Sequence, residues 1–283
     1  MSFLTNWIDG WLKNLLIDGI MGSLGGLFDN VNAQVGVIAG MTGQTPGDFN
    51  PGVFALIRNL SETVVLPIAG LLLTFVMTWE LIQLIIDYNN LHQLDKWIFK
   101  TMIAVLLLSN TFNIVMGIFD VSQHVISRAG GVISNDTAVT LDMLETFRAY
   151  LQTQNVGILF VILMESLIVH VIVLALYIVI FVIVFGRMIE IYLLVSLAPL
   201  PMATLTNREM SNMGHNYLKS LLAVGFQGFL MMVCVGIYAV MVQNIATGGN
   251  ALAAVWVAIG YTVLLCFTLF KTGSISKSIF SAH

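Results

Sequence analysis

A chain of 283 residues that is 58% hydrophobic and only 9% charged cannot hide its apolar surface in a water-soluble fold, because soluble domains carry about 25% charged residues. The composition therefore predicts a polytopic membrane protein and excludes an ordinary soluble enzyme or binding domain. The net charge of -4 is too small to indicate a charged partner, and the lack of a basic block argues against tight DNA binding by this chain alone.

The first 62 residues are predicted to form an extracytoplasmic segment with an amphipathic part and a glycine-rich part. Residues Phe3 to Ile20 place large apolar side chains on one face at helical spacing: Leu4, Ile8, Trp11, Leu12 and Leu15. Because Asp18 interrupts this run, the helix is expected to lie in the membrane interface or to pack on a neighbouring subunit. Residues Met21 to Pro51 are expected to form a helix that packs closely through Gly36 and Gly40, or a loop ordered by assembly.

Apolar segments in residues 63–283 predict an all-α transmembrane domain with about five membrane-spanning helices. The predicted spans are residues 63–86, 97–119, 156–203, 217–242 and 251–270. Pro67 is expected near the start of the first span, where its missing N–H is tolerated. Ser109, Asn110 and Asn113 fall inside the second span and are expected to hydrogen-bond across helices.

The segments between the spans are polar. Residues 87–96 are predicted to form a short hinge, residues 120–155 an extracytoplasmic linker, and residues 206–216 a cytoplasmic loop. Within the linker, Thr137 to Gln154 is predicted to be a surface helix with Asp136 as its N-cap.

The stretch from Val156 to Ala203 is more than twice as long as the about 20 apolar residues that cross a bilayer. A hairpin near Gly186 would divide it into two spans and give six in all. Phe185 to Met188 offer almost nothing to turn the chain, however, and a turn there would leave backbone groups unsatisfied beside lipid. We therefore predict one unusually long helix, continuous or kinked, that ends at Ala198-Pro199-Leu200-Pro201 because Pro199 and Pro201 remove backbone donors.

Lysine and arginine residues indicate which way the chain crosses the membrane. With five spans, the basic residues that fall in short segments on one side are Lys96, Lys100, Arg208, Lys219, Lys271 and Lys277. Those spread over longer segments on the other side are Lys13, Arg58, Arg128 and Arg148. The positive-inside rule then predicts an outside N-terminus and a cytoplasmic C-terminus, although six spans with an inside N-terminus also satisfy it.

Ionisable side chains inside predicted spans each cost roughly 2.5–3.5 kcal/mol on insertion scales unless they are paired or face the protein interior. They are Glu80, Glu165, His170, Arg187 and Glu190. Arg187 and Glu190 are three residues apart and are expected to pair on one helix face. Glu165 and His170 are expected near the outer boundary, and a proton relay would need Glu80 as a deep partner. We expect packing, or contact with another subunit, rather than ion conduction; pore contacts are the alternative.

No pattern in the sequence indicates an enzyme or a bound cofactor. The five histidines show no ligand spacing, so no metal site is expected. Cys234 and Cys266 lie in apolar runs and are expected to be unpaired thiols. Catalytic and nucleotide-binding motifs do not stand out.

The end of the long stretch leads into the most specific motif of the chain. Ser196 to Glu209 reads SLAPLPMATLTNRE, and Gly214 to Leu221 reads GHNYLKSL and leads into the next span. Two further segments are Gly225 to Phe229 (GFQGF) and Cys266 to Ser274 (CFTLFKTGS). Together they resemble the TrbL-like family, the polytopic membrane subunit of conjugative type IV secretion systems, in versions carried by mobile elements of Gram-positive bacteria. The resemblance covers residues 186–283 well and the first half by its layout of spans.

The resemblance implies a channel-forming or channel-organising subunit in the bacterial cell membrane that supports export of single-stranded DNA with its relaxase. It implies other membrane subunits and a separate ATPase subunit as partners, and a symmetric homo-oligomer surrounded by lipid. Longer members of the family carry a large tail that is not seen here, so tail-borne contacts are not carried over. The alternative is a secondary transporter or small-solute channel, which predicts a repeat between halves and broken helices.

Overall fold

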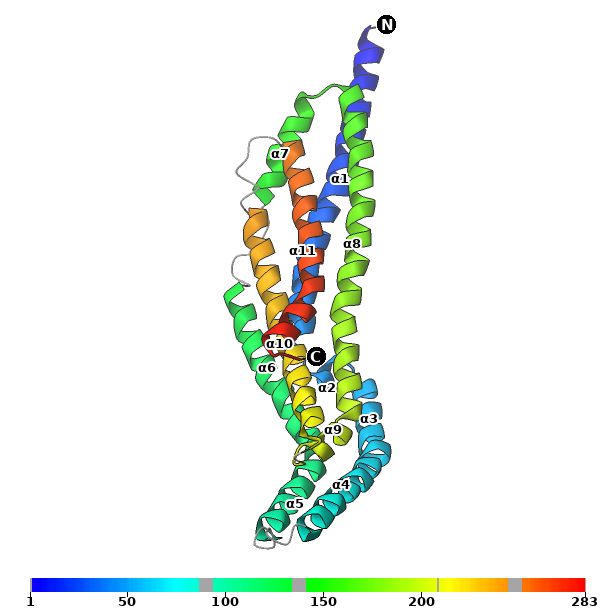
Figure 1. Ribbon diagram of the computed structural model, residues 1–283. Helices are drawn as coiled ribbons and strands as arrows, with labels where there is room; N and C mark the ends of the chain where they lie inside the picture. The colour runs from blue at the N-terminus through cyan, green and yellow to red at the C-terminus, as the bar shows by residue number, and fades with distance from the viewer. Residues whose placement is uncertain (1, 87–93, 134–140, 208, 244–250, 283) are drawn as a thin grey trace. The chain divides into compact units, whose positions relative to one another are not determined.

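The computed structural model describes residues 2–86, 94–133, 141–207, 209–243 and 251–282, and every regular element in these residues is a helix. The α-helices, labelled in Figure 1, are α1 (Ser2–Thr42), α2 (Pro46–Phe49), α3 (Pro51–Leu60), α4 (Leu66–Ile86), α5 (Leu94–Ser109), α6 (Thr111–Ile133), α7 (Leu141–Thr153), α8 (Val156–Leu197), α9 (Pro199–Thr204), α10 (Ser211–Gln243) and α11 (Ala251–Ile279). The π-helix η1 (Ser61–Val65) joins α3 to α4. Within the described residues, 4 helices are long and apolar enough to cross a membrane, or 5 if one bent pair forms a single span. The predicted all-α polytopic fold is confirmed.

The N-terminal helix extends far beyond the predicted amphipathic part. α1 continues through the glycine-rich stretch to Thr42, so most of that stretch is helix and not loop. No described atom lies within 4 Å of the point where a side chain would begin on Gly36 or Gly40, so this pair brings no described helix close. On the predicted apolar face, Trp11 and Leu15 are exposed.

The first predicted span is part of a longer helical stretch, Pro51–Ile86. Pro67 is the second residue of α4, near the start of the predicted span as expected, but helical residues precede it without a break, so its missing N–H does not fall at a free helix end. Pro67 cannot donate to the carbonyl four residues before it. The chain responds with the π-helical turn η1 just upstream, where the Leu66 N–H bonds to the Ser61 carbonyl.

The second predicted span is not a straight helix. α5 and α6 meet at Asn110 and are bent by 66°. Ser109 Oγ and Asn110 Nδ2 both donate to the Leu106 carbonyl, at 3.1 and 3.0 Å. They therefore bond to their own helix, whereas the sequence predicted bonds to a neighbouring helix. Polar side chains that compete for backbone carbonyls commonly bend or end a helix. We attribute the break to this local bonding.

The predicted polar linker is helical over much of its length. α6 continues to Ile133, and α7 confirms a helix within the predicted Thr137–Gln154. The predicted N-cap, Asp136, lies outside the described residues. The extracytoplasmic placement of the linker stays a prediction.

The long apolar stretch forms one continuous helix, as predicted. α8 has 42 residues and passes through Gly186 without a break. At about 1.5 Å per residue it measures about 63 Å, roughly twice the thickness of the hydrocarbon core. α10 begins at Ser211 and α11 reaches Ile279, so the polar loop before α10 is shorter, and the last helix longer, than the sequence indicates.

Contacts divide the chain into two compact units. The first unit contains residues 1–40, 129–184 and 231–270, and the second contains residues 41–128, 185–230 and 271–283. This division differs from the predicted boundary between residues 62 and 63. That residues 1–62 lie outside the cytoplasm stays a prediction.

In the first unit, α1 is tied to α7 and α8. Arg148 Nη2 of α7 pairs with Asp18 Oδ1 of α1 at 3.1 Å, and Ser23 Oγ of α1 donates to the Ser166 carbonyl of α8 at 3.2 Å. The two cysteines, Cys234 and Cys266, also lie in this unit and are free thiols, as expected.

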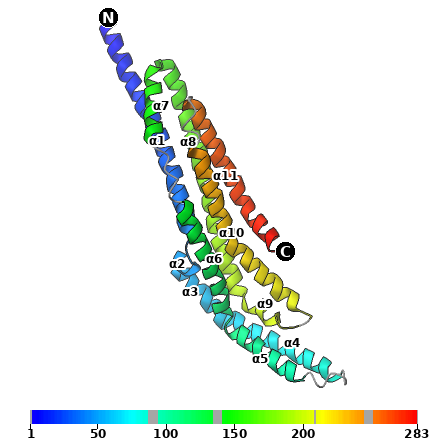
Figure 2. The ribbon, with the colours of Figure 1, turned by 90° about the vertical axis from the view of Figure 1, so that its left-hand side faces the viewer.

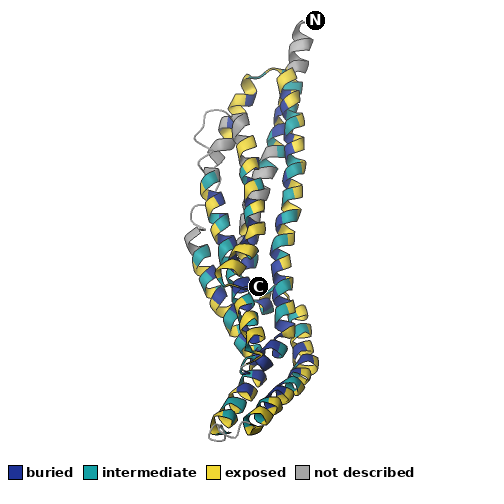
Figure 3. Cartoon of the chain, in the orientation of Figure 1, coloured by how far each residue is buried: buried dark blue, intermediate teal, exposed yellow. Residues whose placement is uncertain are grey.

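In the second unit, the short helix α9 is almost entirely buried (Figure 3). It contacts α4 and α5, which run side by side in Figure 2. Its residues Leu200 and Ala203 join an apolar cluster with Leu73 and Met77 of α4 and Ala104 of α5. Farther along, α8 and α11 run antiparallel to α10, and α6 runs parallel to it, which are the directions that alternating membrane crossings require.

Candidate functional site

A buried arginine lies in the second unit. The Arg187 side chain on α8 is 5% exposed and points at α10. Its Nε donates to the Val224 carbonyl and its Nη2 to the Gly225 carbonyl, both at 3.2 Å. A guanidinium buried without a carboxylate in contact is rare, because desolvation of a charge must be offset by hydrogen bonds. Here the backbone of a neighbouring helix supplies them.

Glycines on α10 create the space for Arg187. In a helix, the side chain of residue i+4 or i+3 leans back over the carbonyl of residue i. Gly228 stands four residues after Val224 and three after Gly225, so each of these carbonyls is left open on the side that a side chain at position 228 would cover. A Cβ on Gly228 would lie 2.7 Å from both Cζ and Nη2 of Arg187. The guanidinium therefore occupies the volume that a side chain at position 228 would fill.

The same two glycines allow α6 to approach α10. A Cβ on Gly225 would lie 2.5 Å from Ser122 Oγ, and one on Gly228 would lie 2.6 Å from Ile126 Cδ1. Small residues at such contacts let membrane helices pack closely. Gly225 and Gly228 thus bring α6, α8 and α10 together around Arg187.

The last turns of α11 complete this cluster. Ser276 Oγ donates to the Ala223 carbonyl at 2.6 Å, so side chains from α8 and α11 bind three successive carbonyls of α10. Lys277 Nζ pairs with Glu190 Oε1 at 2.9 Å. The predicted contact between Arg187 and Glu190 is not formed, because Glu190 pairs with a cation from α11 and Arg187 binds backbone; the Glu190 charge acts on Arg187 only at longer range.

Glu165 and His170 are not part of this cluster. Both lie on α8 in the first unit and are half-buried. Among the described residues, neither side chain makes a hydrogen bond or an ion pair. Glu80 belongs to the second unit. A proton relay through these three residues stays a hypothesis.

The Ala198-Pro199-Leu200-Pro201 motif lies between α8 and α10. α8 ends at Leu197 and α9 begins at Pro199; Ala198, Pro199 and Pro201 are buried. The motif also has a tight contact that the sequence does not announce. A Cβ on Gly214, in the first turn of α10, would lie 2.8 Å from the Pro201 carbonyl oxygen and 2.9 Å from Leu205 Cα. Backbone thus packs against backbone at this position.

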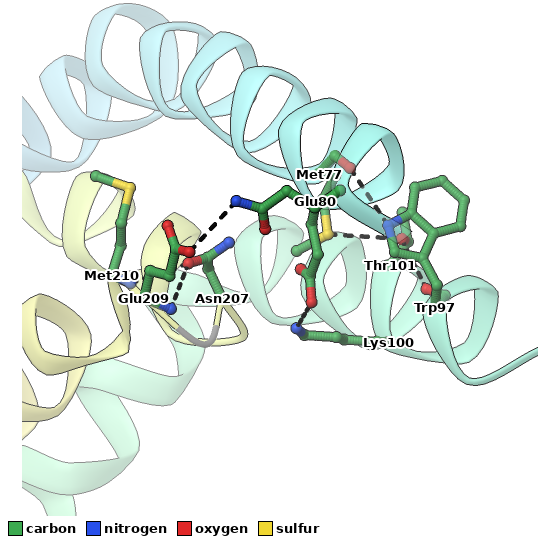
Figure 4. A network of polar contacts seen from close by, with 9 residues as sticks. Met77, Glu80, Trp97, Lys100, Thr101, Asn207, Glu209 and Met210 are labelled. Atoms are coloured by element: carbon green, nitrogen blue, oxygen red, sulfur yellow. Dashed lines mark hydrogen bonds and ion pairs between the residues drawn. The ribbon is translucent and has the colours of Figure 1, made fainter. Parts of the chain in front are cut away.

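A polar network ties α4 and α5 to the segment that follows α9 (Figure 4). The Glu80 carboxylate of α4 pairs with the Lys100 ammonium of α5. Gln83 Nε2 donates to Glu209 Oε1 at 3.4 Å. Asn207 Oδ1 accepts from the N–H groups of Glu209 and Met210, at 2.8 and 2.9 Å, and so orders the turn before α10.

Glu80→Gln is expected to lower the free energy of unfolding by about 1–3 kcal/mol, because a partly buried bond between charged groups is lost and Lys100 is left unpaired. The free energy is measured by SDS titration of the purified protein in micelles. The matched control is Glu62→Gln, which breaks the more exposed Arg58–Glu62 pair and is expected to cost at most about 0.5 kcal/mol. Equal costs for the two variants would contradict the prediction.

The contacts around Arg187 fix helices against one another. In the part of the chain that is described, no group of three or more His, Cys, Asp or Glu side chains could hold a metal ion. Sequence reasoning found Arg187 and Glu190 but missed Ser276 and Lys277 as their neighbours. Gly225 and Gly228 entered the sequence analysis only as part of the GFQGF segment, and small residues inside an apolar span are the signal that indicates close helix packing.

Comparison with known proteins supports the motif-based resemblance. A family model described as TrbL/VirB6 plasmid conjugal transfer like protein matches residues 31–199, more than half of the chain. The match includes α8 and ends at the first proline of the motif, so most of it lies in the part of the chain where the resemblance was one of layout. No curated protein and no solved structure gives a match. Members of this family are structural components of type IV secretion systems. The chain therefore belongs to the TrbL/VirB6 plasmid conjugal transfer like family and is a multi-pass membrane subunit of a conjugal transfer system.

Proposed function

We propose that this chain is a channel or scaffold subunit in the bacterial cell membrane that supports transfer of single-stranded DNA, with attached relaxase, out of the cell. The family match over residues 31–199 carries the proposal, together with the 4 or 5 membrane-spanning helices. Its partners are the other membrane subunits and the ATPase subunit of the secretion system. The transferred DNA is a transient partner, because the chain has no basic block that would bind it tightly.

The geometry around Arg187 suits a scaffold. Bonds from α8 and α11 to α10, and the close approach of α6, fix four helices at one level with no group arranged for catalysis. Identical subunits with such a rigid framework can form a closed ring, which is the usual symmetry of membrane assemblies that surround a path. We propose an outside N-terminus and a cytoplasmic C-terminus, on the distribution of lysine and arginine.

The proposal is tested by mating. A donor strain that lacks the gene is expected to lose DNA transfer, and the wild-type gene supplied in trans is expected to restore it. The solubilised protein is expected to be oligomeric and to co-purify with the ATPase subunit. A monomeric protein whose deletion leaves the mating frequency unchanged would refute the proposal.

A secondary transporter or small-solute channel is the second candidate, and one observation favours it. The 66° break between α5 and α6 is the kind of interrupted helix at which transporters bind substrate. This function predicts solute uptake into proteoliposomes that Glu165→Gln or Glu190→Gln abolishes. Uptake equal to that of empty liposomes would count against it.

A further inference from the structure

The second unit contains two separate apolar clusters. The first joins α6, α8 and α10 and includes Val115, Met188 and Val224, and α3 packs against it. The second joins α4, α5 and α9 and includes Leu73 and Ala203. Among their described members, the two clusters have no residue in common. We call α4, α5 and α9 the hairpin body, and we call α3, together with the parts of α6, α8 and α10 in this unit, the frame.

The chain passes between the frame and the hairpin body at three joints, and regular α-helix is interrupted at each. Between α3 and α4 lies the π-helical turn η1, just before Pro67. Between α5 and α6 lies the 66° break at Asn110. Between α8 and α9, the Ala198 N–H donates to the Val195 carbonyl three residues back, and Pro199 has no N–H. Interruptions of this kind are the places where helices bend.

The break between α5 and α6 satisfies its own backbone. Thr111 Oγ1 lies 3.0 and 2.9 Å from the carbonyl oxygens of Leu107 and Leu108, so its hydroxyl can donate to either of them. The side chains of Ser109 and Asn110 bond to a third carbonyl of the same turn. In apolar surroundings an unsatisfied backbone group is costly. Because the side-chain partners move with the turn, the bend can change its angle without leaving a carbonyl unsatisfied.

Two side-chain hydrogen bonds cross between the hairpin body and its surroundings, and both are long. Ser61 Oγ of η1 donates to the Val195 carbonyl of α8 at 3.5 Å. Gln83 Nε2 of α4 donates to Glu209 Oε1, in the turn before α10, at 3.4 Å. Protein hydrogen bonds are commonly about 2.7–3.2 Å long, so both bonds are weak.

Stronger links lie inside the hairpin body and inside the frame. In the body, the Glu80 carboxylate of α4 pairs with the Lys100 ammonium of α5. In the frame, Tyr217 OH of α10 donates to the Leu194 carbonyl of α8 at 2.9 Å. Each part is therefore better connected within itself than to the other part.

The three joints lie close together, as a common hinge requires. The Ser61 hydroxyl of η1 bonds to Val195, three residues before Ala198. Phe112, two residues after Asn110, packs against the apolar cluster that contains Ala198. All three joints therefore meet at the end of α8.

We propose that the hairpin body tilts as one piece against the frame about these three joints. Hinges consist of a few residues at the ends of elements, which absorb the change in backbone angles. The step from Ala198 to Pro199 in the sequence motif is then a joint as well as a helix end. The proposal goes beyond the proposed function and does not depend on it, because it concerns a motion within one chain and not what the subunit transfers.

Distances between paired spin labels test the proposal. Cysteine pairs are made in a background with Cys234→Ala and Cys266→Ala, and the purified, labelled protein is diluted with unlabelled protein in lipid nanodiscs, so that only distances within one chain are measured. The pairs use exposed positions: Phe75→Cys with Ile98→Cys in the body, Val121→Cys with Leu193→Cys in the frame, and Ile98→Cys with Val121→Cys across the joints. The distance distribution across the joints is expected to be at least about twice as wide as either of the others, because it samples more than one tilt.

Two results would overturn the proposal. A distribution across the joints that is as narrow as the other two means that the body and the frame form one rigid piece. A distribution within the body that is as wide as the one across the joints means that α4 and α5 do not move together. Neither result depends on DNA transfer, so failure of the hinge is distinguishable from failure of the proposed function.

Pro67→Ala tests the joint at η1. The new N–H can donate to the carbonyl of Thr63, four residues back, so the π-helical turn can become α-helix and the distribution across the joints is expected to narrow. Pro51→Ala is the matched control, because Pro51 begins α3, where a missing N–H is tolerated, and it is expected to leave the width unchanged. Equal widths in the two variants would show that η1 is not a joint of the hinge.

Discussion

Gly214→Ala is expected to destabilise the protein by about 1–3 kcal/mol, the usual cost of forcing extra volume into a packed site. The new methyl group would lie 2.8 Å from the Pro201 carbonyl oxygen and 2.9 Å from Leu205 Cα. These are backbone atoms, so no side-chain rotation relieves the contact, and α9 must move away from α10. Unfolding by SDS titration in micelles measures the loss.

The control for this prediction has the opposite sign. Gly117 is exposed on α6, and no described atom lies within 4 Å of a Cβ built there. Gly117→Ala is expected to stabilise the protein by about 0.5–1 kcal/mol, because alanine has the higher helix propensity. If Gly214→Ala is as stable as Gly117→Ala, the close packing of α9 on α10 is wrong.

Hydropathy predicts most of this fold because a long apolar segment must lie across the membrane as a helix. An apolar run such as Val156 to Leu197 is stable only when lipid or protein covers it. The absence of turn residues near Gly186 correctly excludes a hairpin within this run. The break at Asn110 was missed because no proline or glycine marks it. The second half of α6 was assigned to a linker because it is polar, although it continues a helix that packs on α10.

The partners of Arg187 and Glu190 could not be predicted from residue spacing along one helix. Arg187 and Glu190 are spaced to pair on an isolated helix, and nothing in α8 itself argues otherwise. The actual partners come from α10 and α11, which lie far along the chain. Arg187 reaches α10 because Gly228 has no side chain. The sequence does not show which arginine lies in the space beside Gly228. The family could be recognised without this knowledge because its motifs are contiguous segments.

Gly228→Ala is expected to destabilise the protein by about 1–3 kcal/mol, and the cost is expected to depend on Arg187. The added Cβ would lie 2.7 Å from Arg187 Cζ, so the guanidinium must leave the carbonyls of Val224 and Gly225. The second contact, 2.6 Å to Ile126 Cδ1, involves the tip of a side chain that can rotate. Most of the cost should therefore come from the displaced charge.

A double-mutant cycle separates these contributions. In an Arg187→Ala background the guanidinium is absent, so Gly228→Ala is expected to cost less than in the wild type, by at least about 0.5 kcal/mol. Gly225→Ala is the matched control, because its Cβ would meet Ser122 and Phe119 and not Arg187, and its cost should be similar in both backgrounds. A Gly228→Ala cost that is the same with and without Arg187 would show that the glycine serves only the approach of α6. A cost that falls only for Gly228 would show that this space on α10 exists to hold a buried cation, and that the charge and the glycine act as one unit in joining α8 to α10.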